Sequence, residues 1–186
     1  MPKPSDVLDA VRAYQVLFPD EGDTLVELLA FLRTGGRCIF SRKNFFGHIT
    51  CSAVAVGRDN RVLMVLHRSL NMWLLPGGHV EPTDRSLDRA ARREFREEVG
   101  GSSPGLRRCS LWRPGIPIDI DHHPLPANPA KAEPSHSHWD FRFLFRMDDV
   151  DFVAQMEEVS AVEWRPVDVL PERLARKLQR VLGKCS

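Results

Sequence analysis

The stretch at residues 74–101, LLPGGHVEPTDRSLDRAARREFREEVGG, decides how this chain is interpreted. Its second half predicts a helix over about residues 86–99, which the closing glycine pair would end. Within this helix Glu94, Glu97 and Glu98 have the spacing i, i+3, i+4, so their carboxylates share one stripe. Apolar side chains occupy the neighbouring stripe. We therefore expect a helix that packs on a core and presents three carboxylates beside it.

Three carboxylates on one stripe repel one another, at roughly 0.2–0.5 kcal/mol for each exposed pair and more when they are desolvated. A divalent cation with oxygen ligands would compensate, and Mg²⁺ is usually held by a few carboxylates together with substrate phosphates and waters. The backbone carbonyl of Gly77 or Gly78 would add a ligand just before the helix. The alternative is a solvated acidic face among arginines, which is the commoner meaning of a bare E-x-x-E-E pattern.

The whole stretch resembles the Nudix box, G-x5-E-x7-R-E-U-x-E-E-x-G-U, in which U is an apolar residue. The matching positions are Gly78, Arg93, Glu94, Phe95, Glu97, Glu98 and Gly100. Fourteen residues separate Gly78 from Arg93, where the pattern has thirteen. Asp84 stands where the pattern has its first glutamate, and Gly101 takes the last apolar position. The extra residue should bulge the loop without changing the helix register from Arg93 onward.

This resemblance implies an α/β protein with a Nudix-type α/β/α sandwich around a mixed sheet. It also implies a pyrophosphohydrolase that uses Mg²⁺ or Mn²⁺ to cleave a diphosphate linkage between a nucleoside diphosphate and another moiety. The implied metal ligands are Glu94, Glu97, Glu98 and the carbonyl of Gly78. Arg93 would hold the glutamates in a ligating orientation.

The implied catalytic residues are Arg93, Glu97 and Glu98, with Glu158 from the later sequence QMEEVS. The general base stays open among Glu97, Glu157 and Glu158, because a pair of glutamates in a loop is most often only solvated.

Three further residues are candidates for substrate binding. Arg68, at the end of a predicted strand, would make a bidentate phosphate contact or remain an exposed charge. His136 and His138, two positions apart in HSHWD, would face the same side of a strand. With His122 and His123 they form a histidine cluster, for which a second metal site, a phosphate-contacting rim and plain polar loop residues are the alternatives.

Two other functions are compatible with the same fold. A prenyl diphosphate isomerase would need a catalytic cysteine, but the apolar surroundings of Cys51 in ITCSAVAV predict an inert buried thiol. A nucleotide-sensing module without catalysis would typically have lost the box glutamates, and all three are present. The hydrolase is therefore preferred.

Outside the box, apolar periodicity predicts two helices at residues 5–18 and 25–32, which form an N-terminal extension over residues 1–44. They would cover the sheet, shape the pocket or form a homodimer interface. The Nudix domain would occupy residues 45–186. Its further elements are expected as a hairpin at 48–56 and 61–67, strand material at 106–120, a proline-bearing loop at 124–134, strands at 140–146 and 161–164, and a helix at 171–182.

Composition limits the partners. The chain of 186 residues has 26 basic and 25 acidic side chains and a formal charge of +1, which offers no extended surface for nucleic acid. We expect a small nucleotide or diphosphate substrate instead. No apolar run approaches the roughly 18–20 residues that span a bilayer, so a cytoplasmic protein without a membrane partner is expected. Four scattered cysteines without C-x-x-C spacing are expected to be reduced.

Overall fold

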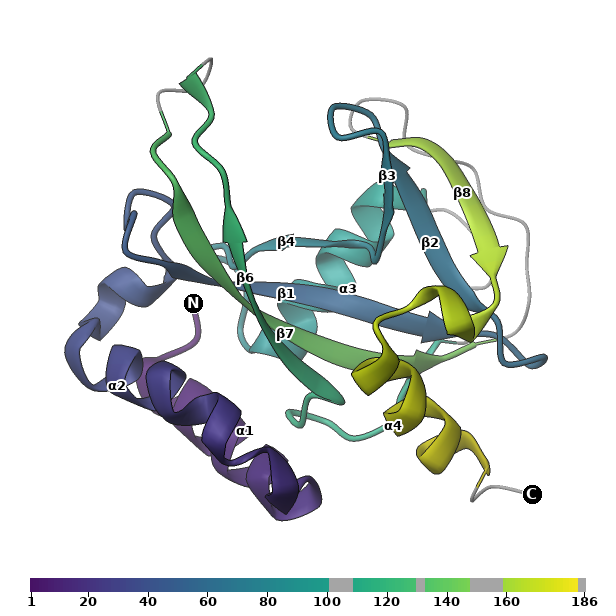
Figure 1. Cartoon of the computed structure of the whole chain (residues 1–186), viewed down its shortest axis with the longest axis horizontal. Coiled ribbons are helices and arrows are strands. Elements are labelled where there is room, and N and C mark those ends of the chain that lie inside the picture. Colours follow the sequence, from purple (N-terminus) through teal and green to yellow (C-terminus); the bar gives the residue numbers. More distant parts are fainter. Residues whose placement is uncertain (101–108, 130–132, 148–158, 184–186) are drawn as a thin grey trace.

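The structure is a computed structural model, and it describes residues 1–100, 109–129, 133–147 and 159–183. In these residues an eight-stranded mixed sheet forms the middle layer (Figure 1). Its two central strands, β1 (His48–Val56) and β7 (His136–Arg146), run parallel in a register from His48↔His138 to Val56↔Arg146. The other strands are β2 (Val62–His67), β3 (Met72–Leu74), β4 (Gly77–His79), β5 (Ser110–Leu111), β6 (Asp119–Leu125) and β8 (Val159–Arg165).

Strand β1 is buried along its whole length. This explains its continuous run of apolar and small residues, because a strand covered on both faces does not alternate with polar positions. On β7, Phe141, Phe143 and Phe145 are fully buried, and Phe145 stacks with Phe95 of the helix at Leu87–Glu98. The core of the molecule therefore lies along the β1–β7 pair.

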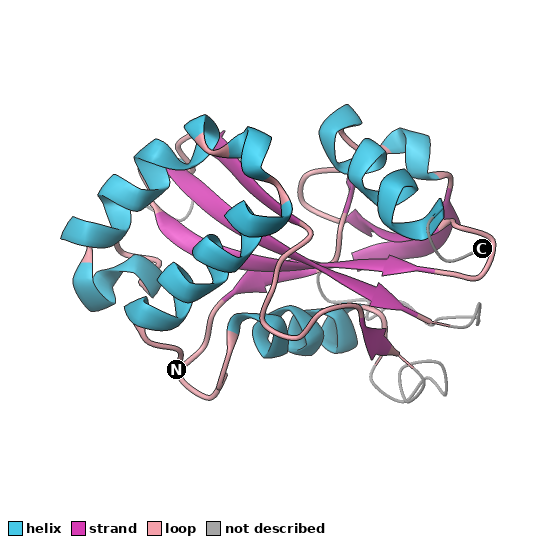
Figure 2. Ribbon diagram, turned by 90° about the horizontal axis from the view of Figure 1, so that it is seen from below, coloured by secondary structure: helices cyan, strands magenta, loops and turns pink. Residues whose placement is uncertain are grey.

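Helices cover both faces of the sheet (Figures 1 and 2). Helix α3 (Leu87–Glu98) lies on one face and contacts β1, β4 and β7. Helices α1 (Pro4–Leu17), α2 (Val26–Thr34) and α4 (Glu172–Leu182) lie on the other. The predicted α/β/α sandwich with N-terminal helices is confirmed. Short 3-10 helices are η1 (Pro19–Glu21), η2 (Asp23–Leu25), η3 (Gly36–Phe40) and η6 (Val167–Val169).

A buried lysine joins the N-terminal helices to the sheet and to α4. Lys177 of α4 donates to Glu21 Oε1 at 2.7 Å and to Asp119 Oδ1 of β6 at 2.7 Å. Its ammonium group also donates to the hydroxyl of Tyr14 on α1 at 2.5 Å. Burial, followed by the charge of Asp119, raises the pKa of Tyr14, so this hydroxyl stays protonated. The N-terminal helices thus share one buried polar network with the rest of the fold.

The predicted hairpin between the first two strands is present but short, because β1 and β2 are antiparallel neighbours joined by a turn in which the Gly57 amide donates to the Arg61 carbonyl at 2.9 Å. β1 and β2 pair only at Val56↔Val62. Beyond that point β1 pairs with β4 and β7, whereas β2 pairs with β3 and β8. The two strands diverge because each has more extensive partners elsewhere in the sheet.

The predicted loop at residues 124–134 is wrong at its start. β6 runs to Leu125, and Pro124 is opposite Ser137 in the antiparallel ladder with β7. Proline is tolerated there because an edge strand does not need every N–H group for pairing. The β6–β7 ribbon extends away from the body of the sheet, as Figure 1 shows. No helix in the described ranges is long and apolar enough to cross a bilayer.

Candidate active site on helix α3

Helix α3 presents its three glutamates at different depths. Its apolar stripe, which includes Leu87 and Phe95, is buried against the sheet. Glu98 is the deepest of the three, at 8% exposed. The side chain of Glu94 is 15% exposed and that of Glu97 is 57% exposed. The stripe therefore runs from the edge of the core out to solvent.

Strand β4 lies against this stripe, and its glycines allow the close approach. The amide N–H of Gly77 donates to Glu98 Oε2 at 3.2 Å. A Cβ atom on Gly78 would lie 2.6 Å from the Glu94 carboxylate, and one on Gly77 would lie 2.8 Å from the Cys51 carbonyl oxygen. A side chain at Gly77 would push β4 away from the β1 backbone, whereas one at Gly78 would displace the Glu94 carboxylate. The glycine pair thus places backbone polar groups directly beside the carboxylates.

Arg93 connects the loop to the glutamates. Its Nε and Nη2 donate to the two carboxylate oxygens of Asp84 at 3.1 and 2.9 Å, which is a bidentate pair. Nη2 also donates to the carbonyl of His79 at 2.8 Å. Nη1 donates to Glu94 Oε1 and Glu97 Oε2, both at 2.9 Å. Because these two oxygens share one donor, the carboxylates of Glu94 and Glu97 face each other.

Asp84 has a defined structural role although it is shorter than the glutamate in the motif. It is 5% exposed and accepts a hydrogen bond from the Glu81 amide at 2.8 Å, in addition to its pair with Arg93. The Asp84 amide donates back to the Glu81 carbonyl at 3.0 Å. The turn absorbs the additional residue before α3 begins at Leu87, so the helix register is unaffected.

The side chains of this site carry more negative charge than Arg93 neutralises. Burial raises the pKa of Glu94, although the neighbouring Arg93 acts in the opposite direction. Burial alone would lower the pKa of Arg93, but its hydrogen bonds and charge contacts with Asp84 and Glu94 raise it. Arg93 is thus permanently charged, yet it is one cation that is hydrogen-bonded to three carboxylates and lies 4.0 Å from a fourth, that of Glu81. This arrangement fits a divalent cation with oxygen ligands.

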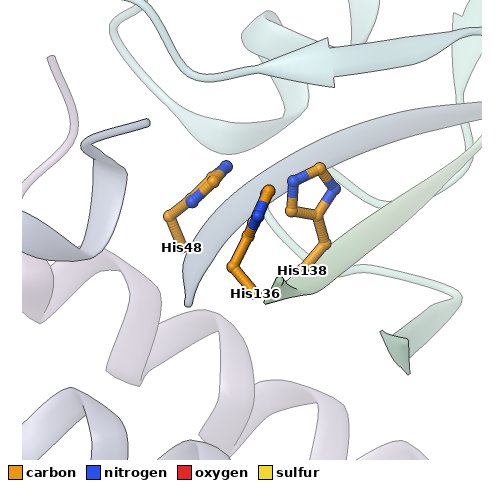
Figure 3. A group of neighbouring side chains, drawn as sticks. All are labelled: His48, His136 and His138. Atoms are coloured by element: carbon orange, nitrogen blue, oxygen red, sulfur yellow. The ribbon is translucent and has the colours of Figure 1, made fainter. Parts of the chain in front are cut away.

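A second group of side chains lies at the start of β1 and β7. One ring nitrogen from each of His48, His136 and His138 lies within 4.8 Å of the others (Figure 3). His48 and His138 are opposite each other in the parallel ladder, and His136 is two positions earlier on β7. His79, which directly follows the glycine pair, places its Nε2 3.0 Å from the Nε2 of His48.

The predicted histidine cluster is therefore only partly correct. His136 and His138 face the same side, as expected. His122 instead stacks on Trp139, with ring centroids 3.7 Å apart. His123 hydrogen-bonds Asp121 at 2.9 Å, and its ring centroid lies 5.6 Å from that of His138. His48 and His79 were missed. The parallel pairing that brings His48 beside His138 cannot be read from local periodicity.

The remaining candidates that the structure describes, Arg68 and Cys51, lie outside both groups. Arg68 is exposed in the turn between β2 and β3. Glu157 and Glu158 lie outside the described residues. Cys51 is completely buried, and burial, followed by the charge of Asp140, raises its pKa, so it is a protonated thiol without access to solvent.

The NUDIX domain family matches residues 48–184 of the chain. Among curated proteins, the chain is similar to a probable DHNTP pyrophosphohydrolase of Lactococcus lactis subsp. cremoris (strain MG1363). The two are 26% identical over 161 residues, which cover 82% of this chain and 90% of the relative.

Solved structures share the fold at lower identity. A C. elegans Ap4A hydrolase in a binary complex has a TM-score of 0.54 at 17% identity, covering 73% of this chain and 98% of its own. The E. coli dihydroneopterin triphosphate pyrophosphohydrolase has a TM-score of 0.51 at 16% identity, covering 73% and 95%. A NUDIX family hydrolase from Clostridium perfringens has a TM-score of 0.51 at 20% identity, covering 75% and 98%.

Proposed function

Because this chain belongs to the Nudix family, we propose that it uses a divalent cation, held by the carboxylates of α3, to cleave a diphosphate linkage in a nucleoside diphosphate derivative. The enzyme class predicted from the box, a Nudix-type pyrophosphohydrolase, agrees with the family and with the name of the Lactococcus lactis relative. The cation, the residue roles and the substrate are the parts that we propose here.

One observation carries the proposal, namely the excess of carboxylates around Arg93. Glu94, Glu97 and Glu98 would bind the cation, and the carbonyl of Gly78 would add an oxygen from the strand that lies against Glu94. These are the oxygen ligands that Mg²⁺ and Mn²⁺ prefer. When bound, the cation would neutralise phosphate oxygens and lower the pKa of a water that attacks phosphorus.

The protein groups would have separate tasks. Arg93 would act as a positioning residue, since it fixes the carboxylates of Glu94 and Glu97 from one nitrogen and is itself held by Asp84. The carboxylate of Glu98 accepts a hydrogen bond from the Gly77 amide, which fixes its orientation. Glu97 is the most exposed of the three glutamates, and among the residues that the structure describes it is our candidate for the general base. Glu158 remains a second candidate for that role.

The substrate would reach the site from solvent at the exposed end of the stripe. Arg68, His136 and His138 are the residues that we propose for substrate contact, because a guanidinium and imidazoles suit phosphate oxygens. We also propose residues 1–44 as an extension to a Nudix domain at 45–186. The Lys177 network, which joins this extension to β6 and α4, supports a role for the extension in covering the sheet.

The two alternative functions are less well supported. An isomerase would need a reactive cysteine, and Cys51 is buried with a raised pKa. A sensing module would not need Glu94, Glu97 and Glu98 arranged around Arg93.

The direct test measures phosphate-containing products released from a panel of substrates with Mg²⁺ or Mn²⁺. The panel comprises nucleoside triphosphates, nucleotide sugars, ADP-ribose, dinucleoside polyphosphates and dihydroneopterin triphosphate. The last compound is included because the names of two similar proteins refer to it. We expect at least one compound to be cleaved, and only when a divalent cation is present. Turnover that persists in a chelator, or a panel in which nothing is cleaved with either metal, would contradict the proposal.

A further inference from the structure

We propose that His48, His136 and His138 form a second metal site, which binds a transition-metal ion such as Zn²⁺ through nitrogen. This site is chemically distinct from the oxygen site of α3 and does not depend on the proposed hydrolase activity. Three observations support it, namely the convergence of the rings, the way in which backbone carbonyls fix their protons, and a buried nitrogen without a partner.

The three rings converge from two strands that pair in parallel. One nitrogen of each ring lies within 4.8 Å of the others, and the ring centroids of His48 lie 5.1 Å from those of His136 and 4.5 Å from those of His138. Zn–N bonds of about 2.0–2.1 Å in a tetrahedral site need ligand nitrogens about 3.3 Å apart. A modest rotation of the half-buried His136 side chain would reduce this gap.

Backbone carbonyls fix the protonation of two of the rings. Nδ1 of His136 lies 2.9 Å from the carbonyl of Pro134, and Nδ1 of His48 lies 3.4 Å from the carbonyl of Asn44. A carbonyl only accepts, so Nδ1 must carry the proton in each ring, and Nε2 keeps a lone pair. Metal-binding histidines characteristically donate their other N–H in this way, which holds the ring in a ligating orientation.

The third ring has a polar atom that the protein itself leaves unused. Nε2 of His138 is buried and has no hydrogen-bond partner among the described residues. An unpaired buried polar atom costs about 1–3 kcal/mol, and a bound ion would remove this cost.

His79 links this group to the box. Since the proton of His48 is on Nδ1, Nε2–H of His79 donates to His48 Nε2, and a metal ion would replace this hydrogen bond. The His79 carbonyl accepts from Arg93, so the two metal sites would be neighbours. Three protein ligands leave one position open, as in catalytic zinc sites. A phosphate oxygen could take it, which makes the metal role compatible with substrate contact by His136 and His138.

Ligand chemistry predicts which ion binds where. Imidazole nitrogen suits Zn²⁺, Co²⁺, Ni²⁺ and Cu²⁺, whereas Mg²⁺ favours the oxygen ligands of α3. An excess of Mg²⁺ should therefore occupy the carboxylates without competing for the histidines.

The test uses the full chain, stripped of metal and then given Zn²⁺ or Co²⁺ in excess Mg²⁺. Bound zinc is counted per chain after gel filtration, and the visible absorption of Co²⁺ reports the ligand geometry. We expect about one zinc ion per chain and a tetrahedral Co²⁺ spectrum. His136→Gln and His138→Gln should each weaken zinc binding at least about 100-fold, because loss of an outer-shell partner alone costs about 10- to 100-fold. His136 is half-buried, so its variant should fold even if the His138 variant does not.

Two controls locate the ion. The first control is His122→Gln. His122 belongs to the same β-ribbon but stacks on Trp139, so this variant should bind zinc as the unmodified chain does. Glu98→Gln alters the oxygen site and should also retain zinc. The proposal is overturned if the unmodified chain binds no zinc in excess Mg²⁺, if His136→Gln binds it equally well, or if Glu98→Gln loses it.

Discussion

Substitution of Arg93 by Met should destabilise the fold as well as impair the site. The change keeps the long stem and the helix propensity but removes five hydrogen bonds. Two of these bonds end on Asp84, which is 5% exposed and would be left as a buried charge without its partner. Removing one partner of a buried ion pair costs about 3–5 kcal/mol. Water can reach the side chain of Arg93, which is 19% exposed, so we expect about 3 kcal/mol.

Thermal and urea unfolding measure this loss. For a chain of this size 1 kcal/mol corresponds to roughly 2–4 °C, so Tm should fall by roughly 6–12 °C. The matched control is Arg96→Met, which changes an exposed arginine on the same helix and should cost less than about 1 kcal/mol. Hydrolysis by the Arg93 variant, assayed well below its Tm, should also fall because Glu94 and Glu97 lose their shared donor.

A double-mutant cycle tests the reasoning itself. If Arg93 stabilises the fold mainly through Asp84, then Asp84→Asn should reduce the cost of Arg93→Met by at least about 1 kcal/mol. Additive costs for the two changes, or an Arg93→Met protein within 1 kcal/mol of the unmodified chain, would refute the central place that we give to this ion pair.

Three further predictions follow from the site and its surroundings. Gly78→Ala should reduce hydrolysis more than about 10-fold while Tm changes little, because the new Cβ would lie 2.6 Å from the Glu94 carboxylate; unchanged kinetics would show that the strand can move aside. Cys51→Ala should hydrolyse substrate within about threefold of the rate of the unmodified chain. Loss of activity at an unchanged Tm would instead support a catalytic role for Cys51. The His123 hydrogen bond, against the effect of burial, lowers the pKa of Asp121 from 3.8 to about 2. The stability that this carboxylate contributes is therefore complete above pH 3.8 and is lost as the pH falls toward 2. Asp121→Asn should therefore reduce the loss of unfolding free energy between pH 4 and pH 2 by about 2 kcal/mol. An unchanged pH dependence of the unfolding free energy would contradict this role of Asp121.

The helix that carries the carboxylates could be predicted closely from the sequence. Its expected bounds, residues 86–99, differ by one residue at each end from α3 (Leu87–Glu98). Helical spacing is a local property, and both the apolar stripe and the acidic stripe follow from it. The same locality explains why the insertion before α3 left the register of Glu94 unchanged.

The arrangement of the strands was harder to predict because partner choice is not local. β1 was expected to pair with the next strand, but its main partner is β7, which begins at His136. That long-range pairing brings His48 beside His138, and no periodicity within either strand indicates it. Lys177 was likewise unpredictable, since an amphipathic helix pattern places lysine on the solvated face, and its burial requires Glu21 and Asp119.

The most direct test of the central claim is the dependence of hydrolysis on Mg²⁺ concentration in Glu98→Gln. Glutamine can still accept the Gly77 amide, so the fold should persist, but one anionic ligand is lost. We expect kcat/KM to fall at least about 100-fold, because a metal contributes several kcal/mol of transition-state stabilisation. The control Glu172→Gln changes an exposed glutamate of α4 and should behave as the unmodified chain. A Glu98→Gln enzyme with full activity and an unchanged Mg²⁺ requirement would contradict the account.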